Sequence, residues 1–323
     1  MKSYLASIIK ESAEDLKQKG FTPIKINYNG SQGNTTRWTK TLPGGQKTTV
    51  FNKINKQASP MEITAHLSQI LRELVARDII KAANINSEAN GLGELFPIPA
   101  DYQYDVTMEK INKDLKTVTD ELIPSFNTAV PFGEYNQDRM KKIADKYNPI
   151  MLAIGESDRH LDNFIRSGTD RKKHYAIDFG NSFLTRTSQS SLKPQIRIAI
   201  DKVSNKNSIA KLLKFWTMYE MFVEKNTEYF KTLIPKYKKE ISYKFAKNVR
   251  EKIKTKQLPS TAEEIAMMAL EGLEKSSNLM EENIEFNLHD LGFFSKAMIE
   301  RLEAKSRPPR YVSSFNKNAP LSR

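Results

Sequence analysis

The chain has 323 residues, of which 39% are hydrophobic and 28% charged, and its net charge is +13. Such a chain is long enough for one large domain or two lobes of a soluble globular protein. The absence of cysteine excludes disulfide partners, thiolate metal sites and a cysteine nucleophile, and no stretch approaches the roughly 20 apolar residues of a membrane span. The apolar run near the N-terminus is too short for a secretory signal, so we expect a soluble protein without signal peptide or transmembrane segment.

Residues 3–54 predict a helix followed by three strands. Apolar residues recur at helical spacing over 3–18, and the helix is expected to end at Gly20. Alternation of apolar and polar residues then predicts strands over 23–28, 35–41 and 48–54, with Gly-bearing turns at 29–34 and 42–45.

A long helix is predicted after the third strand. Ser59 is its expected N-cap, Pro60 takes the first helical position and Glu62 completes a capping box. The apolar stripe continues to about Ala83. Further along, we expect a loop over 84–100, a strand over 104–109, a helix from residue 112, a loop over 124–136 and a helix over 137–152.

Beyond residue 200 the pattern is helical almost throughout. A second capping box begins at Ser260, and Ile265, Met268, Ala269 and Leu273 are predicted to be buried. The proline-containing tail is expected to be flexible. The predicted organisation is an α+β protein with a β-rich N-terminal lobe at 1–110, a mostly helical C-terminal lobe at 111–304 and a basic tail at 305–323.

The charge is unevenly distributed along the C-terminal half. Residues 231–256 carry ten Lys or Arg and two Glu, whereas residues 259–292 carry one Lys and eight Asp or Glu. Basic stretches attract polyanions such as nucleic acid or acidic membranes. The alternative, which we favour, is that the two blocks pair with each other or are simply hydrated.

The segment 155–180 carries the strongest signal in the chain. It contains the runs DRHLDN and IDFG, so that Asp158 is followed five residues later by Asn163 and twenty residues later by Asp178. Transfer of a phosphoryl group from ATP needs such a set. One carboxylate positions the accepting hydroxyl and takes its proton, while an Asn oxygen and a second carboxylate hold Mg²⁺ against the phosphates.

The order of the preceding elements points to the same chemistry. Three strands and a helix, with a lysine on the third strand, build the small lobe of a kinase. The turn with Gly30 and Gly33 would cover the phosphates, and Lys53 would neutralise their oxygens. The alternatives are a surface lysine on an edge strand and a polar surface loop at 155–180. Glu62 or Glu73 could pair with Lys53, although capping already explains Glu62.

The runs DRHLDN and IDFG resemble the signature shared by phosphoinositide kinases and HipA-like protein kinases, an atypical branch of the protein-kinase-like fold. By length, basic character and these runs, the whole chain is also similar to bacterial pro-inflammatory serine/threonine kinases. The resemblance implies a two-lobed kinase fold that uses ATP and Mg²⁺. It implies Asp158 as catalytic base beside Arg159 and His160, Asn163 and Asp178 as Mg²⁺ ligands, Lys53 as the ATP lysine, and Met108, Glu109 and Lys110 at the adenine-binding hinge.

The sequence also departs from the family pattern. The small lobe lacks a strong Gly-rich fingerprint, and residues 181–200 are Ser/Thr-rich without a basic cluster. The latter favours a protein substrate with a Ser or Thr hydroxyl over an inositol head group. A lipid kinase acting on acidic membranes and a basic or toxin-like binding module with a silent kinase site stay open as alternatives.

The resemblance further implies secretion and action in the cytoplasm or nucleus of host cells. Autophosphorylation is expected either in the basic tail or in the Ser-rich segment after the IDFG run. The candidate hydroxyls are Ser188, Ser190, Ser191, Ser313, Ser314 and Ser322.

Overall fold

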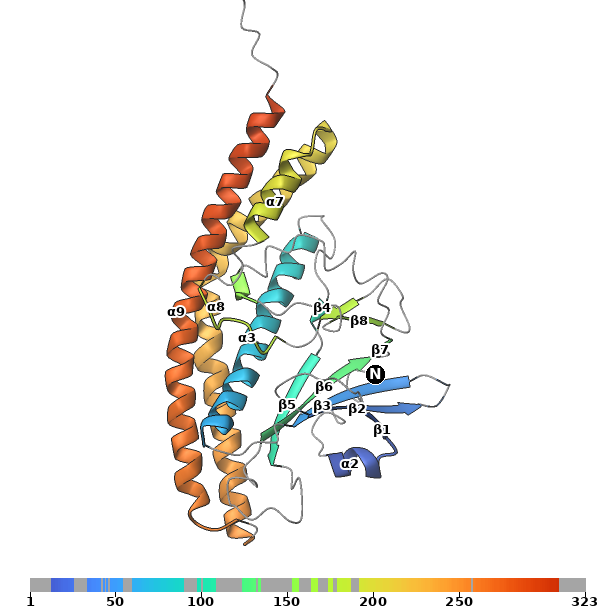
Figure 1. The fold of residues 1–323 in the computed structure, drawn as a ribbon, viewed down its shortest axis with the longest axis vertical. Helices are drawn as coiled ribbons and strands as arrows, with labels where there is room; N and C mark the ends of the chain where they lie inside the picture. The colour runs from blue at the N-terminus through green and yellow to red at the C-terminus, as the bar shows by residue number, and fades with distance from the viewer. Residues whose placement is uncertain are drawn as a thin grey trace, which may run out of the picture.

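A computed structural model shows the arrangement of the chain (Figure 1). It describes residues 13–25, 34–41, 43, 45, 47–54, 60–89, 98–99, 101–108, 124–131, 133–134, 153–156, 164–167, 174–176, 179–186, 192–256 and 258–307. Two small sheets lie on one side, and a pair of long helices lies on the other. The α+β class expected from the sequence fits this arrangement.

The larger sheet is antiparallel and has the strand order β1-β2-β3-β6-β5. Its strands are β1 (Thr22–Lys25), β2 (Asn34–Thr41), β3 (Lys47–Ile54), β5 (Asp101–Met108) and β6 (Pro124–Pro131). The four strands predicted from alternation are confirmed within the described residues. The sheet includes β6, although this strand lies beyond residue 110, the predicted end of the N-terminal lobe.

The predicted loop over 124–136 is wrong, because most of it forms β6 and β7 (Gly133–Glu134). Prolines at both ends of β6 and polar residues within it suggested a turn. However, β6 pairs with β3 on one side and β5 on the other, so its backbone groups find partners in both ladders. Its prolines stand at the strand ends, where a missing N–H costs least.

A second, smaller sheet has the strand order β4-β9-β8-β7. Here β4 (Ile98–Pro99) pairs in parallel with β9 (His174–Ala176), and β8 (Phe164–Ser167) pairs antiparallel with β9 and β7. This sheet joins two strands of the segment 155–180, β8 and β9, to two strands that precede it in the chain. It therefore positions the chain around the predicted site.

The short helix α2 (Ala13–Gln18) precedes β1 and ends, as predicted, before Gly20, whose φ is +80°. A positive φ suits glycine, which has no Cβ to clash with the backbone. Leu16, Phe21 and Trp38 form a small buried cluster between this helix and the sheet.

The helix α3 (Pro60–Ala89) lies between the larger sheet and the two long helices (Figure 1). It is one and a half turns longer than predicted. On the far side from the sheet, the Thr64 hydroxyl donates to the backbone carbonyl of Ala269 at 3.2 Å. Arg77 donates to the Tyr237 hydroxyl at 2.8 Å, and that hydroxyl donates to Asp78. These contacts fix α3 to both long helices.

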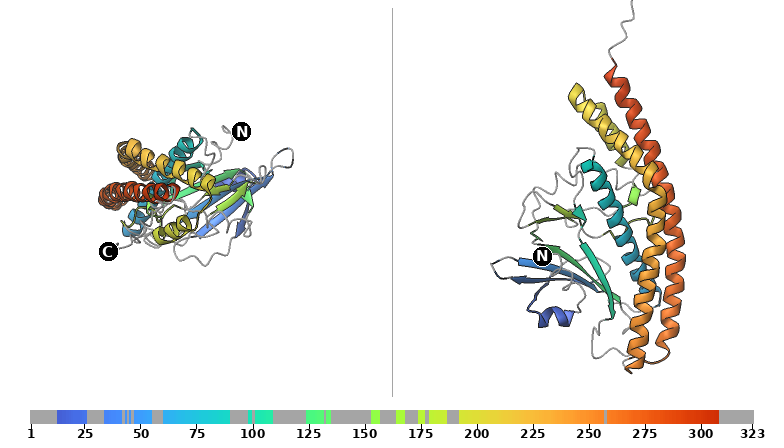
Figure 2. Two further views of the ribbon diagram at one scale, coloured as in Figure 1. Left: turned by 90° about the horizontal axis from the view of Figure 1, so that it is seen from above. Right: turned by 180° about the vertical axis from the view of Figure 1, so that it is seen from behind.

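The long helices α8 (Lys206–Lys254) and α9 (Ala262–Ser306) run antiparallel and form one layer of the molecule (Figure 2). Buried residues recur every seven positions along each, as in a coiled coil. They include Ile209, Trp216, Val223, Phe230 and Tyr237 on α8, and Ala266, Leu273, Met280, Asn287 and Phe294 on α9. The predicted helical character beyond residue 200 is confirmed, and none of the described helices has the length and apolarity needed to cross a membrane.

Two details predicted for the start of α9 are wrong. Met268 is 58% exposed, because the buried stripe passes through Ala266 and Ala269 instead. No side chain caps the helix: the N-cap residue is Thr261, with helical φ and ψ and no side-chain capping bond. The carbonyls of Pro259 and Ser260 accept from the N–H groups of the first two helical residues, so a tight backbone turn replaces the capping box.

The basic block on α8 pairs in part with the acidic block on α9, as favoured from the sequence. Lys231 lies 3.1 Å from Glu285, and Lys238 lies 2.7 Å from Glu274. Arg250 adds a third, longer ion pair with Glu263 beside the turn between the helices. Solvent reaches these pairs and screens their charges, so each contributes little to the stability of the fold.

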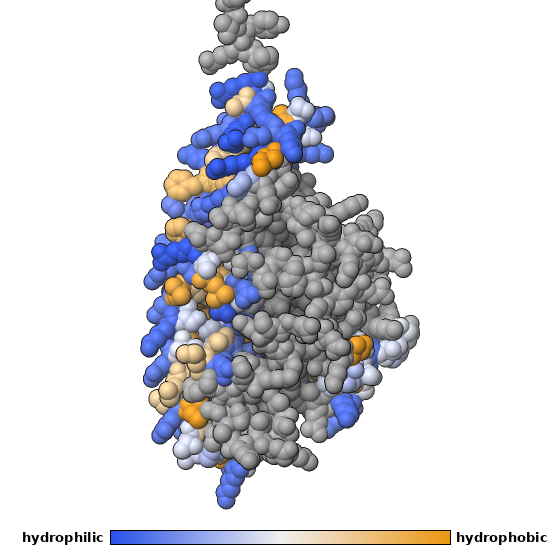
Figure 3. All heavy atoms as spheres, viewed as in Figure 1, coloured by the Kyte–Doolittle hydropathy of each residue, from blue (hydrophilic) through white to orange (hydrophobic). Residues whose placement is uncertain are grey.

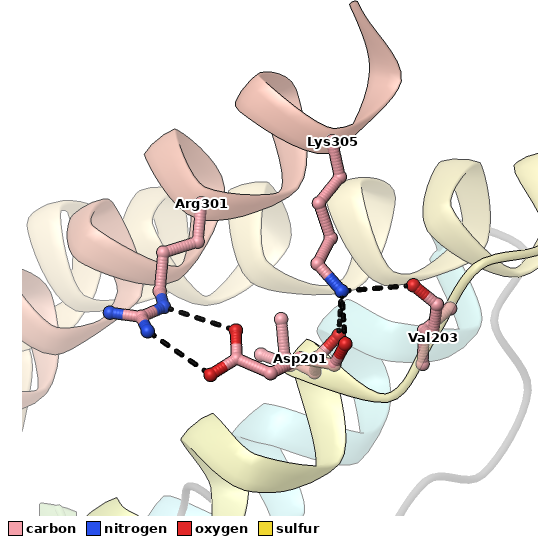
Figure 4. Close-up of polar contacts among 5 residues, drawn as sticks. Asp201, Val203, Arg301 and Lys305 are labelled. Atoms are coloured by element: carbon pink, nitrogen blue, oxygen red, sulfur yellow. Dashed lines mark hydrogen bonds and ion pairs between the residues drawn. The ribbon is translucent and has the colours of Figure 1, made fainter.

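A short helix, α7 (Leu192–Asp201), docks against the end of α9 (Figure 4). Arg301 pairs with the Asp201 carboxylate, with its Nη2 at 3.1 Å. The Lys305 ammonium donates to the carbonyls of Ile200, Asp201 and Val203. It thereby caps the C-terminus of α7, where the carbonyls lack intrahelical partners and the helix dipole is negative.

Candidate functional site

The structure describes the segments that flank the predicted site more fully than the site itself. Asp158, Arg159, His160, Asn163 and Asp178 lie outside the described residues, as do Gly30, Gly33, Glu109 and Lys110. Lys53, Met108 and Glu62 lie in described elements. The geometry of the site therefore rests on the elements that enter and leave it.

The β8–β9 pairing brings together the two segments that carry the predicted metal ligands. Phe164, which follows Asn163, pairs with Ala176, which precedes Asp178 by two residues. Paired residues in an antiparallel ladder lie about 5 Å apart, and consecutive Cα atoms are about 3.8 Å apart. Chain connectivity therefore limits the separation of the Asn163 and Asp178 Cα atoms to about 17 Å.

The chain before the DRHLDN run contacts the chain after the IDFG run. The Phe183 N–H donates to the carbonyl of Ile154 at 2.7 Å, and the Ser182 hydroxyl donates to the Glu156 carboxylate at 2.8 Å. Ile154, Glu156, Ser182 and Phe183 are all buried. These bonds hold the two flanks of the predicted site in one rigid unit.

The helix α9 supports this unit from one side. Asn283 donates to the Phe183 carbonyl at 2.8 Å. This bond gives a partner to the carbonyl of a residue whose φ is +60°. Gly155 has a φ of +58°, and an added Cβ would lie 2.7 Å from Nδ2 of Asn287. Glycine at this position thus lets the turn before the site approach α9 closely.

The helix α3 supports the unit from the other side. Arg72 donates from Nε to the carbonyl of Gly180, the glycine of the IDFG run, at 2.5 Å. An added Cβ at Gly180 would lie 2.6 Å from Cγ of Gln69, so glycine at this position lets α3 approach without a shift of Gln69. Burial lowers the pKa of Arg72 to about 10, while the nearby carboxylates of Glu73 and Glu156 oppose that shift.

Lys53 lies on the central strand of the larger sheet. Its backbone pairs with Thr35 of β2 and with Phe126 of β6. The alternative of a lysine on an edge strand is therefore wrong. Met108 is the last residue of β5 and pairs with Pro124 at the start of β6, so the predicted hinge begins where the chain leaves the sheet.

The two candidate partners of Lys53 differ in burial. Glu62 lies in the first turn of α3 and is partly exposed, whereas Glu73 lies mid-helix and is 1% exposed. Gln69 donates weakly to Glu73 at 3.5 Å, and the Arg72 guanidinium lies close enough for the two charges to interact. A carboxylate at such a position is costly unless cations or hydrogen-bond donors surround it.

The structure adds residues that the sequence did not single out, among them Gln69, Arg72, Glu156 and Ser182. Glu156 and Ser182 lie within a few residues of the two runs, and that proximity was the available signal. Gln69 and Arg72 are more than a hundred residues from Gly180 in sequence, and no local pattern links them.

The sequence matches no model of a known protein family. A search of curated proteins likewise finds no similar sequence. Within the described part of the chain, no three His, Cys, Asp or Glu side chains gather in a way that could hold a metal ion. The predicted ligands Asn163 and Asp178 lie outside that part.

Proposed function

We propose that this protein transfers the γ-phosphoryl group of ATP to a serine or threonine hydroxyl of a protein substrate. The observation that carries the proposal is the placement of the DRHLDN and IDFG runs at the two ends of one β8–β9 hairpin. In this account Asp158 positions the hydroxyl and accepts its proton, and Arg159 and His160 hold the loop and the transferring group.

An amide oxygen and a carboxylate match the hard oxygen ligands that Mg²⁺ prefers, so Asn163 and Asp178 would hold this ion. Bound there, Mg²⁺ would supply positive charge against the phosphates. The bonds among Ile154, Glu156, Ser182 and Phe183 restrict both ends of the loop that carries these residues. Restricting them before substrate arrives lowers the entropic cost of reaching the reactive geometry.

Lys53 on the central strand would bind phosphate oxygens, with Gly30 and Gly33 covering them and residues 108–110 contacting adenine. We assign the carboxylate that orients Lys53 to Glu73 rather than Glu62. Glu73 lies on the buried face of α3, and this helix packs beside β6, the neighbour of the Lys53 strand. The two lobes would then meet after β6, beyond residue 131.

We favour a protein substrate over an inositol phosphate because the basic side chains that follow the IDFG run form ion pairs within the protein. Arg186 lies 2.6 Å from the Glu282 carboxylate, and Lys193 is paired with Asp290. The first two basic side chains that follow the IDFG run in the described residues are therefore engaged with α9. An inositol phosphate would need free cations at this point.

The test is transfer of label from γ-labelled ATP to a generic protein substrate and to phosphoinositide vesicles. Asp158→Ala and Asp178→Ala should each abolish transfer while leaving the unfolding transition in place. Asp170→Ala, which removes a carboxylate between β8 and β9 with no assigned role, is the matched control. Full activity in either site variant would refute the assignment, and label on lipid alone would replace the protein substrate by a lipid.

Autophosphorylation is part of the same proposal. The predicted acceptors, in the segment 188–191 and in the basic tail, all lie outside the described residues: Ser188, Ser190, Ser191, Ser313, Ser314 and Ser322. Phosphopeptide mapping after incubation with Mg–ATP should find label in at least one of the two regions. Its absence from both would remove this element of the proposal.

A further inference from the structure

One face of α8 carries a line of lysines that does not face α9. Lys236, Lys239, Lys247 and Lys254 are exposed, and Tyr243 lies among them with 67% of its surface exposed. At about 100° per residue, these five residues fall within about 80° of arc, and they extend over about 27 Å of helix. We call this set the lysine stripe.

The stripe lies opposite the packed face of the helix. Buried residues in the same stretch, such as Ile234, Ile241 and Phe245, point about 150–170° away from its centre at helical spacing. The basic block of α8 is therefore split in two. Lys231 and Lys238 pair with carboxylates of α9, whereas the stripe points to the other side.

The stripe is almost free of acidic neighbours. In the described part of the chain, Lys247 has one ion pair, at 3.8 Å with Glu251 of its own helix, and no carboxylate is within ion-pair distance of Lys236, Lys239 or Lys254. Glu240, the other acid on this side of α8, pairs with Lys244 at 2.9 Å. The positive charges of the stripe repel one another along the helix, and a bound polyanion would reduce this repulsion.

We propose that the lysine stripe binds single-stranded nucleic acid, with the four lysines along the phosphates and a base stacked on Tyr243. Sites that bind single strands without sequence preference combine exposed aromatic rings, on which bases stack, with cations that contact the phosphates. The stripe has no aliphatic side chain that could enter a lipid bilayer, as a membrane-surface helix requires. The apolar face of α8 is already covered by α3 and α9 (Figure 2). This site is independent of the proposed phosphoryl transfer.

The test is fluorescence anisotropy with a labelled oligothymidylate of about 20 nucleotides. Replacing the four stripe lysines by Gln should weaken binding on the order of a hundredfold at about 0.1 M salt, and should reduce the slope of log affinity against log salt by about 3. The matched control replaces Lys206, Lys211, Lys214 and Lys225 of the same helix by Gln. It makes the same change in net charge at other exposed positions.

Substitutions at Tyr243 distinguish the contribution of base stacking to binding from that of the lysine charges. Tyr243→Ala should weaken oligothymidylate binding on the order of tenfold, and Tyr243→Phe should retain most of the affinity, because the ring and not the hydroxyl is used. Equal losses in the stripe and control variants would overturn the proposal. So would the absence of binding by the unchanged protein, or stripe-dependent binding to phosphatidylserine vesicles in preference to the oligonucleotide.

Discussion

At the scale of single residues, Gly180 shows why the last position of the IDFG run has no side chain. Its carbonyl accepts from Arg72, and its Cα faces Gln69 so closely that an added Cβ would force the Gln69 side chain or α3 to shift. Both partners lie on α3. A residue of the predicted site is thus fixed by a helix that the chain reaches more than a hundred residues earlier.

We predict that Gly180→Ala lowers the free energy of unfolding by about 1–3 kcal/mol, because Gln69 or α3 must shift to make room. In a Gln69→Ala background the same substitution should lower the free energy of unfolding by markedly less, because Gln69→Ala removes the Cγ atom that the added Cβ would meet. Urea unfolding of the four proteins of this cycle gives the coupling energy. A coupling near zero would show that the close approach is not what restricts Gly180.

The burial of Glu73 gives a second prediction at this scale. If Glu73 orients Lys53, Glu73→Gln should lower kcat/KM for ATP by about 10- to 100-fold, about 1.4–2.7 kcal/mol of transition-state stabilisation. Glu62→Gln, on the partly exposed first turn of the same helix, should change it by less than about threefold. Steady-state kinetics of both variants separates the two assignments, and a larger loss for Glu62→Gln would reverse them.

At the scale of elements, α3 is the helix that joins the sheet, the predicted site and the long helices. Its link to α8 is the triad of Arg77, Asp78 and Tyr237. Burial, together with the hydrogen bond that the hydroxyl donates to Asp78, raises the pKa of Tyr237, and burial likewise raises the pKa of Tyr219. In the folded protein both phenols therefore keep their protons to higher pH than in the unfolded chain.

The higher phenol pKa in the folded protein determines how its stability changes with pH. Above about pH 10 the unfolded chain loses the phenol protons and the folded protein keeps them, so stability falls with rising pH by about 1.4 kcal/mol per pH unit for each tyrosine. Tyr237→Phe should remove one such contribution. Tyr243→Phe, which removes an exposed hydroxyl from the same helix, should leave the slope unchanged. Denaturant titrations at several alkaline pH values test this, and equal slopes for all three proteins would contradict it.

At the scale of the whole molecule, local patterns in the sequence predicted the elements but not how they meet. Alternation identified β1, β2, β3 and β5, and apolar periodicity identified α3, α8 and α9, because each of these signals depends on near neighbours in the chain. The strand β6 was missed because its conformation is determined by pairing with β3 and β5, strands distant in sequence. Figure 3 shows hydrophilic residues along the outer edge of the helical pair. The sequence predicted the charge blocks of α8 and α9, but not the division of the basic block into one paired set and one lysine stripe.

The same distinction applies to the candidate site. Each of the runs DRHLDN and IDFG is continuous in the sequence, so the sequence alone could single them out and predict their chemistry. The residues that fix the flanks of these runs come from α3 and α9, at positions such as Arg72 and Asn283. Their importance depends on tertiary contacts, which no spacing in the sequence encodes.

The central claim is that Asn163 and Asp178 hold a divalent ion beneath bound ATP. Electron paramagnetic resonance of Mn²⁺, used in place of Mg²⁺ with a non-hydrolysable ATP analogue, measures this directly. We predict nucleotide-dependent Mn²⁺ binding by the unchanged protein and by Asp170→Ala, weakened at least about tenfold in Asn163→Ala and in Asp178→Ala. Mn²⁺ binding that is independent of nucleotide, or equal in all four proteins, would contradict the account.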